Sequence, residues 1–555
     1  MNERPIGLTK GPGETPHEFL FVSPDREQAL KVGEFVVYRA PVDGQERNIL
    51  ARVTQRQPLR LYPDAFLADP GVGPEQVATL LGYEQASPDL FELVATVIGY
   101  YDAALGDFIN PRVPPRSGCP ITLASDKLLA AVLSKRRADD TGAGHIGSLL
   151  SRPSGQVPVM LDLAAIASTH LAILASTGAG KSYLAAVLIE ELLKPNNRAA
   201  ILVVDPHGEY NTLIEMLNHP AFIAPEYRPD VQILKPDAVK VRVGTLTLGD
   251  LFYLLPNLSE KMSYLLRQVY REVCQRSQIT RHDPERWTRG ELIGALQKIA
   301  EDDDNKQDAG TAGALIWRLE SVLEHQSAIF DDFHHLDLNR LFRPGRCSVL
   351  QLNEVDEREQ QVTVATLLRR LFAARMKTQK GLVKEGDELY LPYPVFVLME
   401  EAHRFAPAGG EAVSAGVLKT VLSEGRKFGV AVGLISQRPG KLDADVLSQC
   451  GTQCILRIVN PLDQNRVAES VETVGRDLLR ELPALTKGQD IIAGEAVNTP
   501  VLCQVRQRYT PHGAESRNAP EEWLAYFAPE EQARRERESA PLAVPKRSGE
   551  SKMFK

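Results

Sequence analysis

The sequence predicts an α/β protein with a mostly parallel sheet, preceded by a β-rich segment and interrupted by helices. From residue 170 onward, short apolar runs are each followed by turn residues and a helical stretch, a pattern typical of parallel strands covered on both faces. These runs are HLAILA (170–175), ILVVD (201–205), SVLQL (348–352), VFVLM (395–399) and VAVGLIS (430–436). With 555 residues, 43% of them hydrophobic, the chain has room for roughly three or four folded units.

The N-terminal segment has a different pattern, because β-type runs are separated by turn residues with no helical stretches between them. The runs are FLFV (19–22), EFVVYRA (34–40), ILARVT (49–54) and ELVATVIGYY (92–101). They predict a small β-barrel or sandwich. We therefore expect a β-domain at 1–120, two parts of an α/β core at 121–249 and 343–510, a helical insertion at 250–342, and a C-terminal segment at 511–555.

Helical periodicity supports the insertion. One predicted helical face carries Met262, Leu265, Leu266, Val269, Tyr270 and Val273. Thr288 and Glu291 have the spacing of a capping box just before another apolar periodic segment, which predicts a second helix. The acidic stretch 301–308 is expected to be a solvated loop. The charged segment after residue 528 has few large apolar residues and is expected to be mobile.

Charge and composition limit the classes of partner. The formal charge of −8 gives no general sign of nucleic-acid or anionic-membrane binding, so any DNA contact must use local patches. No apolar run is long enough to span a bilayer, and the first residues lack the layout of a signal peptide, which predicts a cytoplasmic protein without a membrane. The six cysteines form no CxxC pair, so Cys450 and Cys454 are expected to pack as small apolar side chains.

The strongest chemical signal is ASTGAGKS (175–182), between a strand-like run and a helical stretch. Small residues let backbone N–H groups curl around phosphate, and the following helix directs its positive dipole end at the same anion. This Walker A pattern predicts that Lys181 reaches the β- and γ-phosphates of ATP and that Ser182 holds Mg²⁺. Ala175 departs from the pattern, which has glycine there. The expected nucleotide-binding residues are Ser176, Thr177, Gly178, Ala179, Gly180, Lys181, Ser182 and Tyr183.

A second signal is VFVLMEEAHRF (395–405), an apolar strand that ends in two carboxylates. It has the form of a Walker B motif, in which the first acid lies beside the metal and the second activates the attacking water. We therefore expect Glu400 to contact Mg²⁺ and its waters and Glu401 to be the catalytic base. The alternative is a helix N-terminus that carries acids because its dipole favours them.

Three further residues follow or precede predicted strands. Asp205 ends a strand at the carboxyl edge of the sheet and is expected to support Mg²⁺ or water. Gln437 follows another strand, where an amide can sense the γ-phosphate or simply cap a loop. Arg426, in SEGRKFG, is the best candidate for an arginine finger or a sensor within the same chain, with ordinary surface pairing as the alternative.

Several other polar residues have two open interpretations. His207 and Glu209 serve either the site or the turn that contains Pro206 and Gly208. Weaker candidates for the arginine role are Arg438, Arg457 and Arg466. One helix carries a basic cluster that either contacts DNA or, the favoured interpretation, forms a charged helix exterior, namely Arg369, Arg370, Arg375 and Lys377.

In this order and spacing, HLAILASTGAGKS, VVDPHGEY, VFVLMEEAHRFAP and SEGRKFGVAVGLISQRP resemble the HerA family of hexameric DNA translocases, within the HerA/FtsK branch of P-loop ATPases. The resemblance implies a RecA-like P-loop core, an N-terminal barrel of the type found in HerA and ATP synthase, and an inserted helical bundle. It supports the roles given above to Lys181, Ser182, Glu400, Glu401 and the two sensing residues Arg426 and Gln437. GEAVNTPVLCQVR (494–506) resembles the strands after which a C-terminal segment braces a neighbouring subunit.

The family implies an ATP-driven homo-hexameric ring that threads double-stranded DNA and works with a nuclease. That partner is a NurA-like nuclease in DNA-end resection and repair, or a Sir2-type or other nuclease effector in antiphage defence. A second hypothesis is a scaffold ring that assembles and activates a nuclease under ATP control without translocation. A third is a motor for protein or conjugative substrates, against which the absence of a transmembrane run argues.

Overall fold

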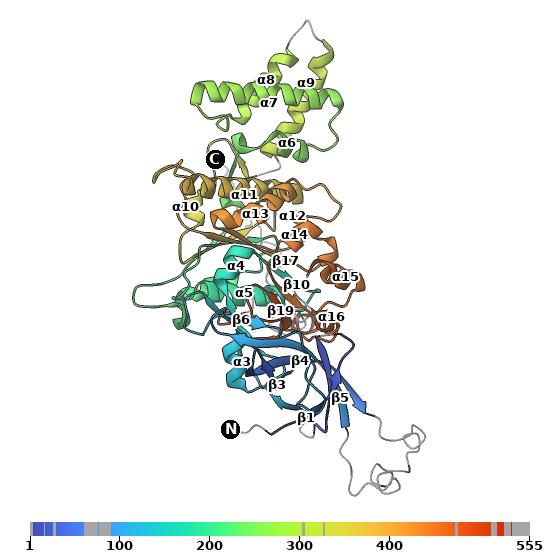
Figure 1. The fold of residues 1–555 in the computed structure, drawn as a ribbon. Coiled ribbons are helices and arrows are strands. Elements are labelled where there is room, and N and C mark those ends of the chain that lie inside the picture. Colours follow the sequence, from blue (N-terminus) through green and yellow to red (C-terminus); the bar gives the residue numbers. More distant parts are fainter. Residues whose placement is uncertain are drawn as a thin grey trace, which may run out of the picture. The chain divides into compact units, whose positions relative to one another are not determined.

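The computed structural model describes residues 4–15, 17–25, 29–59, 71, 76, 90–301, 306–325, 328–471, 475–511, 519–526 and 534. Residues up to Pro511 form one compact unit, drawn in blue through orange in Figure 1, and the residues from His512 onward form a second unit. Within the described part of the chain, no helix combines the length and the apolar character needed to cross a bilayer. The predicted mobile tail after residue 528 lies outside the described residues apart from Arg534.

The N-terminal segment is a closed β-barrel, as one of the two sequence-based interpretations held. The strands follow the order β2-β1-β7-β3-β4-β5, and β5 pairs back onto β2, so every strand has two neighbours. Alternating side chains point inward, and the barrel interior includes Phe19, Phe21 and Tyr38. The strands are β1 (Gly7–Pro12), β2 (Glu18–Ser23), β3 (Phe35–Val42), β4 (Gln45–Leu59), β5 (Leu90–Asp102), with β6 (Asp107–Ile109) appended to it, and β7 (Pro120–Leu123).

The core is a large mixed sheet with the order β12-β15-β11-β16-β17-β10-β18-β19-β20-β8-β9. Strands from β12 to β18 are parallel, and the pairs from β18 to β9 are antiparallel. The strands are β8 (Ala143–Leu149), β9 (Pro158–Asp162), β10 (Leu171–Leu174), β11 (Ile201–Asp205), β12 (Asp230–Leu234), β15 (Arg346–Gln351), β16 (Val395–Met399), β17 (Val430–Ser436), β18 (Thr452–Leu456), β19 (Gln489–Gly494) and β20 (Val501–Val505).

Helices cover both faces of this sheet, which explains why its parallel strands are almost wholly apolar. One face packs on α5 (Lys181–Leu192), whose residues share a buried cluster with Ile173, Val203 and Leu398. The other face packs on α11 (Glu357–Gln379) and α13 (Val413–Phe428), which also contact each other. Smaller helices of the core are α3 (Asp126–Val132), α4 (Leu163–Thr169), α10 (Leu338–Leu341), α12 (Ala402–Phe405), α14 (Ala444–Ser448), α15 (Pro461–Ser470) and α16 (Arg476–Leu479).

The predicted helical insertion is present (green to yellow in Figure 1). It contains α6 (Leu248–Leu254), α7 (Glu260–Arg281), α8 (Arg289–Ala300) and α9 (Lys306–Glu320), followed by one π-helical turn (Ser321–His325). Thr288 and Glu291 form the expected capping box. On α7, the predicted apolar face is buried at Leu265, Leu266, Val269 and Val273 and partly buried at Met262 and Tyr270. The acidic-loop prediction was wrong at its end, because 306–308 belong to α9.

The basic cluster on α11 is not a charged exterior. Arg375 is 1% exposed and donates hydrogen bonds to the carbonyl oxygens of Phe428 (2.9 Å) and Leu391. Arg369 pairs with Asp250, and Arg370 pairs with Glu388. These guanidinium groups therefore hold α11 against neighbouring elements, and the favoured sequence interpretation was wrong for them. By contrast, Cys450 and Cys454 are buried free thiols, as predicted.

Candidate functional site

The site lies where four neighbouring parallel strands end. In the order β11-β16-β17-β10, each strand delivers one predicted functional segment to the same edge of the sheet. Asp205 ends β11, Glu400 follows β16, Gln437 follows β17, and the phosphate-binding loop follows β10. Because the carboxyl ends of parallel strands meet at one edge, motifs that are more than 200 residues apart in sequence come together here.

The loop between β10 and α5 has the backbone conformation of an anion cradle. Gly178 and Gly180 have φ angles of 78° and 107°, which side chains with a Cβ rarely adopt. Gly180 precedes α5 without a side-chain cap, so the first N–H groups of that helix have no intrahelical acceptor. Ala175 is buried, has an ordinary φ, and its N–H donates to the Ser436 carbonyl (3.1 Å), which explains why glycine is not needed there.

Lys181 joins the two predicted motifs. Its Nζ lies 2.8 Å from Glu400 Oε2 and 3.2 Å from Glu401 Oε1. Burial alone would lower the pKa of Lys181, but the attraction of Glu400 and Glu401 outweighs burial and raises it. The ammonium group therefore stays charged at the position where the loop would present phosphate.

The two Walker B carboxylates have different surroundings. Glu400 is fully buried and accepts a hydrogen bond from the Tyr210 hydroxyl. Burial raises its pKa, although Lys181 and the Tyr210 hydroxyl act in the opposite direction. Glu401 is 1% exposed and takes a left-handed backbone conformation (φ 51°), and its Oε2 has no hydrogen-bond donor among the described residues. His403 Nδ1 lies 3.3 Å from that oxygen. Glu401 thus has one carboxylate oxygen that accepts no hydrogen bond from the described residues and lies beside the His403 imidazole.

The sequence reasoning left Glu209 undecided between the site and the turn, and it missed Tyr210. The Ser182 hydroxyl donates a hydrogen bond to the Glu209 carboxylate. Asp205, expected near the metal, instead closes the turn that carries Glu209 and Tyr210. Its Oδ1 accepts N–H bonds from His207, Gly208 and Glu209 (3.2, 2.8 and 3.2 Å), and its Oδ2 accepts one from Tyr210 (3.3 Å). The available sequence signal was the pair Glu209 and Tyr210 directly after the Pro206–Gly208 turn.

The two predicted sensing residues lie at opposite ends of strand β17, Arg426 before its first residue and Gln437 after its last. Gln437 contacts the phosphate-binding loop, because its Oε1 accepts a hydrogen bond from Thr177 Oγ1 (3.0 Å). Arg426 lies near the end of α13, before β17 begins, and is exposed. The seven residues of β17 separate the two edges by roughly 20 Å. The strand end next to Arg426 is therefore the one remote from the phosphate-binding loop of the same chain. The exposed Arg457 is nearer, since its carbonyl accepts the Ser176 N–H (2.8 Å).

The donor set fits a magnesium–nucleotide complex. Mg²⁺ prefers oxygen ligands and is commonly held by one or two protein groups, with phosphate and water oxygens completing an octahedron. Ser182, Glu209 and Glu400 supply such oxygens beside Lys181. Among the described residues there is no group of three or more carboxylate, thiol or imidazole side chains arranged to enclose a metal by themselves. The oxygens of Ser182, Glu209 and Glu400 could fill part of the Mg²⁺ coordination, with phosphate and water oxygens in the other positions.

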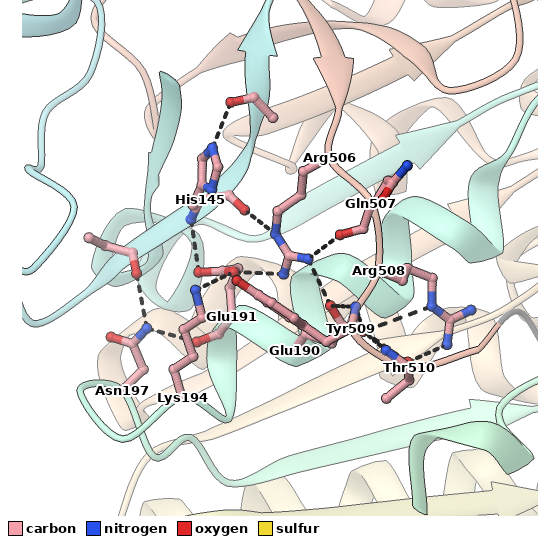
Figure 2. A network of polar contacts seen from close by, with 12 residues as sticks. His145, Glu190, Glu191, Lys194, Asn197, Arg506, Gln507, Arg508, Tyr509 and Thr510 are labelled. Atoms are coloured by element: carbon pink, nitrogen blue, oxygen red, sulfur yellow. Dashed lines mark hydrogen bonds and ion pairs between the residues drawn. The ribbon is translucent and has the colours of Figure 1, made fainter. Parts of the chain in front are cut away.

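The helix that follows the loop is anchored from its far end (Figure 2). Glu190 and Glu191 of α5 are 0% and 1% exposed, and Figure 2 shows both facing Arg506 and the segment that follows it. Arg506 lies 2.9 Å from Glu190 Oε2 and 2.7 Å from Glu191 Oε1. The N–H groups of Tyr509 and Thr510 donate to Glu190 Oε1 (3.0 and 2.9 Å). The strand β20 and its continuation thus fix the orientation of α5.

The same segment reaches the start of α5. The Arg508 N–H donates to the Tyr183 hydroxyl (2.8 Å), and the Arg508 guanidinium lies over the Tyr183 ring. Arg508 also donates to Thr212 and Thr510. Tyr183, a predicted nucleotide-binding residue, is therefore held by the segment 506–510, a contact that no local sequence pattern indicates.

Comparisons with known proteins identify relatives of this chain. A family profile described as the central domain of helicase HerA matches residues 144–371. A probable helicase of Methanocaldococcus jannaschii is 31% identical over 419 residues, covering 75% of this chain and 76% of the relative. The DNA double-strand break repair helicase HerA of Pyrococcus furiosus is 29% identical over 458 residues, covering 75% and 77%.

Among solved structures, VirB4 of Thermoanaerobacter pseudethanolicus has 14% identity and a TM-score of 0.47, covering 67% of this chain and 98% of that chain. This likeness is too weak to carry an argument about the site. The sequence relatives, the family profile and the ordered motifs together are sufficient to assign the family of this chain. The chain belongs to the HerA helicase family.

Proposed function

We propose that this protein is a Mg²⁺-dependent ATPase that acts as a double-stranded DNA translocase or helicase. The observation that carries the proposal is the convergence of Lys181, Glu400 and Glu401, with the lysine Nζ within 3.2 Å of both carboxylates, beside a glycine loop with an anion-binding conformation. A P-loop lysine and a buried pair of carboxylates are the groups needed to bind and hydrolyse a nucleoside triphosphate.

Each residue has a separate role in the proposed reaction. Lys181 and the N–H groups at the start of α5 bind the phosphates. Glu401 accepts a proton from the attacking water through the carboxylate oxygen that accepts no hydrogen bond from the described residues. Ser182, Glu209 and Glu400 hold Mg²⁺, which neutralises charge on the phosphate oxygens. Gln437, which contacts Thr177, orients the γ-phosphate end of the site.

The position of Arg426 supports a homo-hexameric ring. Arg426 is exposed and precedes β17, whose other end, roughly 20 Å along the strand, lies beside the phosphate-binding loop. If this guanidinium acts on a nucleotide and not in ordinary surface pairing, that nucleotide belongs to another subunit. Repeated contacts of this head-to-tail kind generate a closed ring when the rotation between subunits closes. We therefore assign Arg426 to the neighbouring subunit's site.

We further propose that the ring works with a nuclease. The relative from Pyrococcus furiosus is named for the repair of DNA double-strand breaks, which supports a role in DNA-end resection with a NurA-like partner. A Sir2-type or other nuclease effector in antiphage defence is the alternative partner. A scaffold ring that activates a nuclease without translocation is a second candidate function, because the same nucleotide site can control assembly instead of movement.

The test uses two substitutions in the purified chain. Lys181→Ala should remove nucleotide binding and hydrolysis, whereas Glu401→Gln should keep binding and lose hydrolysis by at least about 100-fold. Arg276→Ala, in which an exposed arginine loses only its partner Glu272, is the control and should hydrolyse ATP normally. ATP turnover in Glu401→Gln at the wild-type rate would refute the site. Full activation of a partner nuclease by Glu401→Gln would favour the scaffold.

A further inference from the structure

Three cationic side chains gather beside the catalytic base. Arg404 lies on α12, which follows Glu401, and Arg438 and Lys441 lie on the loop after β17 that includes a 3-10 turn (Pro439–Lys441). Arg438 and Lys441 are exposed and Arg404 is half-buried. The cluster is thus formed by two loops that leave adjacent strands at the same edge of the sheet as the phosphate-binding loop.

Backbone hydrogen bonds fix these two loops to each other. The Ala408 N–H donates to the Lys441 carbonyl (2.7 Å), and the Asp443 N–H donates to the Ala406 carbonyl (2.9 Å). Pro407 and Leu442 form a β-bridge between them. The backbones of the two loops that carry the cations are therefore fixed to each other.

None of the three cations has a carboxylate partner within the described ranges of the chain. The nearby carboxylates are used elsewhere: Asp443 pairs with Lys419 (2.9 Å), and Asp463 accepts the Gly440 N–H (2.7 Å). Basic residues of the insertion behave differently, since Arg276 and Arg281 each pair with a glutamate. Like charges held close without a counter-charge repel one another. Such a cluster is stabilised when an anion binds.

The cluster is connected to the catalytic base through His403. This side chain is largely buried, and burial, together with the positive charges of Arg404, Arg438 and Lys441, lowers its pKa despite the opposing effect of Glu401. His403 Nδ1 lies 3.2 Å from Ser436 Oγ and 3.3 Å from Glu401 Oε2. The Arg438 N–H donates to the same Ser436 hydroxyl (3.1 Å). Ser436 and His403 therefore form a continuous line of contacts from the Arg438 backbone to Glu401.

We propose that Arg404, Arg438 and Lys441 bind a phosphodiester of the DNA backbone, and that phosphate held there adjusts Glu401 through Ser436 and His403. The inference rests on the proposed function and names the site by which DNA would control hydrolysis. His403 is a positioning residue in this scheme, because it contacts Glu401 and not the substrate. A backbone phosphate suits the cluster, since guanidinium and ammonium groups carry sequence-independent DNA contacts.

The experiment compares the double variant Arg404→Gln/Lys441→Gln with the charge-matched control Arg276→Gln/Arg281→Gln in the full-length protein. ATP hydrolysis is measured with and without linear duplex DNA, and DNA affinity is measured from 50 to 200 mM salt. We expect the double variant to keep its rate without DNA and to lose stimulation. Its plot of log affinity against log salt should flatten by about one for each DNA phosphate that the variant no longer binds. The control should match wild type.

A second variant isolates the connection to the base. His403→Gln should retain the wild-type salt dependence of DNA binding while losing stimulation, which a merely structural role for His403 would not produce. Inorganic phosphate at the same phosphate concentration should not stimulate wild type; stimulation by it would assign the cluster to free phosphate and overturn the DNA site.

Three other outcomes count against the inference in different ways. Undiminished stimulation and an unchanged salt dependence in the double variant would overturn it and leave the proposed function intact. If the double variant hydrolyses ATP more slowly than wild type even in the absence of DNA, the cations would be assigned to binding the nucleotide and not DNA. Failure of DNA to stimulate the wild-type protein would refute the proposed function, and the inference would fall with it.

Discussion

Replacing Arg506 with methionine should strongly destabilise the core, because this guanidinium is placed between two buried carboxylates of α5. Arg506 contacts Glu190 and Glu191 at 2.9 and 2.7 Å and also donates to the His145 carbonyl (2.9 Å). Methionine keeps most of the apolar stem but removes the charge. Glu190 would retain the N–H donors of Tyr509 and Thr510, and Glu191 would retain Lys194.

The expected loss in the free energy of unfolding follows from the burial of the two carboxylates. Removing one partner of a buried ion pair costs about 3–5 kcal/mol, because it leaves an uncompensated charge in a medium of low polarity. The remaining donors place the expected loss near the lower end, at about 3 kcal/mol. An exposed pair such as Arg276 and Glu272 contributes only about 0.5 kcal/mol, so Arg276→Met should cost little.

Equilibrium urea unfolding, followed by circular dichroism, measures the free energy of unfolding of the wild type and both variants. The double variant Arg506→Met/Glu190→Gln should recover part of the loss, since one buried charge is then removed together with its partner. A loss below about 1 kcal/mol in Arg506→Met, or no recovery in the double variant, would refute the view that this network anchors α5.

Three other substitutions have defined outcomes. Burial raises the pKa of Asp490 to about 8, so between about pH 4 and pH 8 the unfolded chain loses this proton while the folded chain keeps it, and stability falls with rising pH. Urea unfolding of Asp490→Asn should therefore show a pH slope that is less negative by up to about 1.4 kcal/mol per unit in this window. An unchanged slope would show that Asp490 does not titrate in this way. Glu209→Ala should raise the Mg²⁺ concentration for half-maximal ATP hydrolysis by about tenfold. The control Glu226→Ala, at an exposed glutamate, should leave this concentration unchanged. An unaltered Mg²⁺ titration in Glu209→Ala would contradict the role of Glu209 in holding Mg²⁺. Gly429→Ala should lower stability by about 1 kcal/mol or more, because its φ is 70° and a Cβ would lie 3.1 Å from Arg375 Nη2; a neutral result in the same unfolding assay would contradict this.

The parts of the fold that sequence predicted are those with strong local signals. The five continuous apolar runs became β10, β11, β15, β16 and β17, because strands buried on both faces need apolar residues at every position. Strands with weaker signals were missed or only partly indicated. β8 contains two glycines and His145. β12, the outermost strand on its side of the sheet, contains the polar residues Asp230 and Gln232. β18 begins with Thr452 and Gln453.

The site was predictable to the extent that each motif is contiguous. The Walker A and Walker B segments needed only their own residues and their flanking strand and helix patterns. The bond from Ser182 to Glu209 and the bond from Tyr210 to Glu400 depend on how the turn after β11 folds, which no spacing rule gives. Glu190 and Glu191 illustrate the same limit, because two adjacent glutamates on a helix suggest a solvated face until Arg506 is placed beside them.

The central claim is that DNA drives ATP hydrolysis by a ring of these chains. The most direct test is ATP hydrolysis with and without linear double-stranded DNA, measured together with mass in solution by light scattering. We predict stimulation by DNA in a particle about six times the 61.2 kDa of the chain, abolished by Glu401→Gln. A rate of hydrolysis that is the same with and without DNA, in a particle with the mass of a single chain, would contradict the claim.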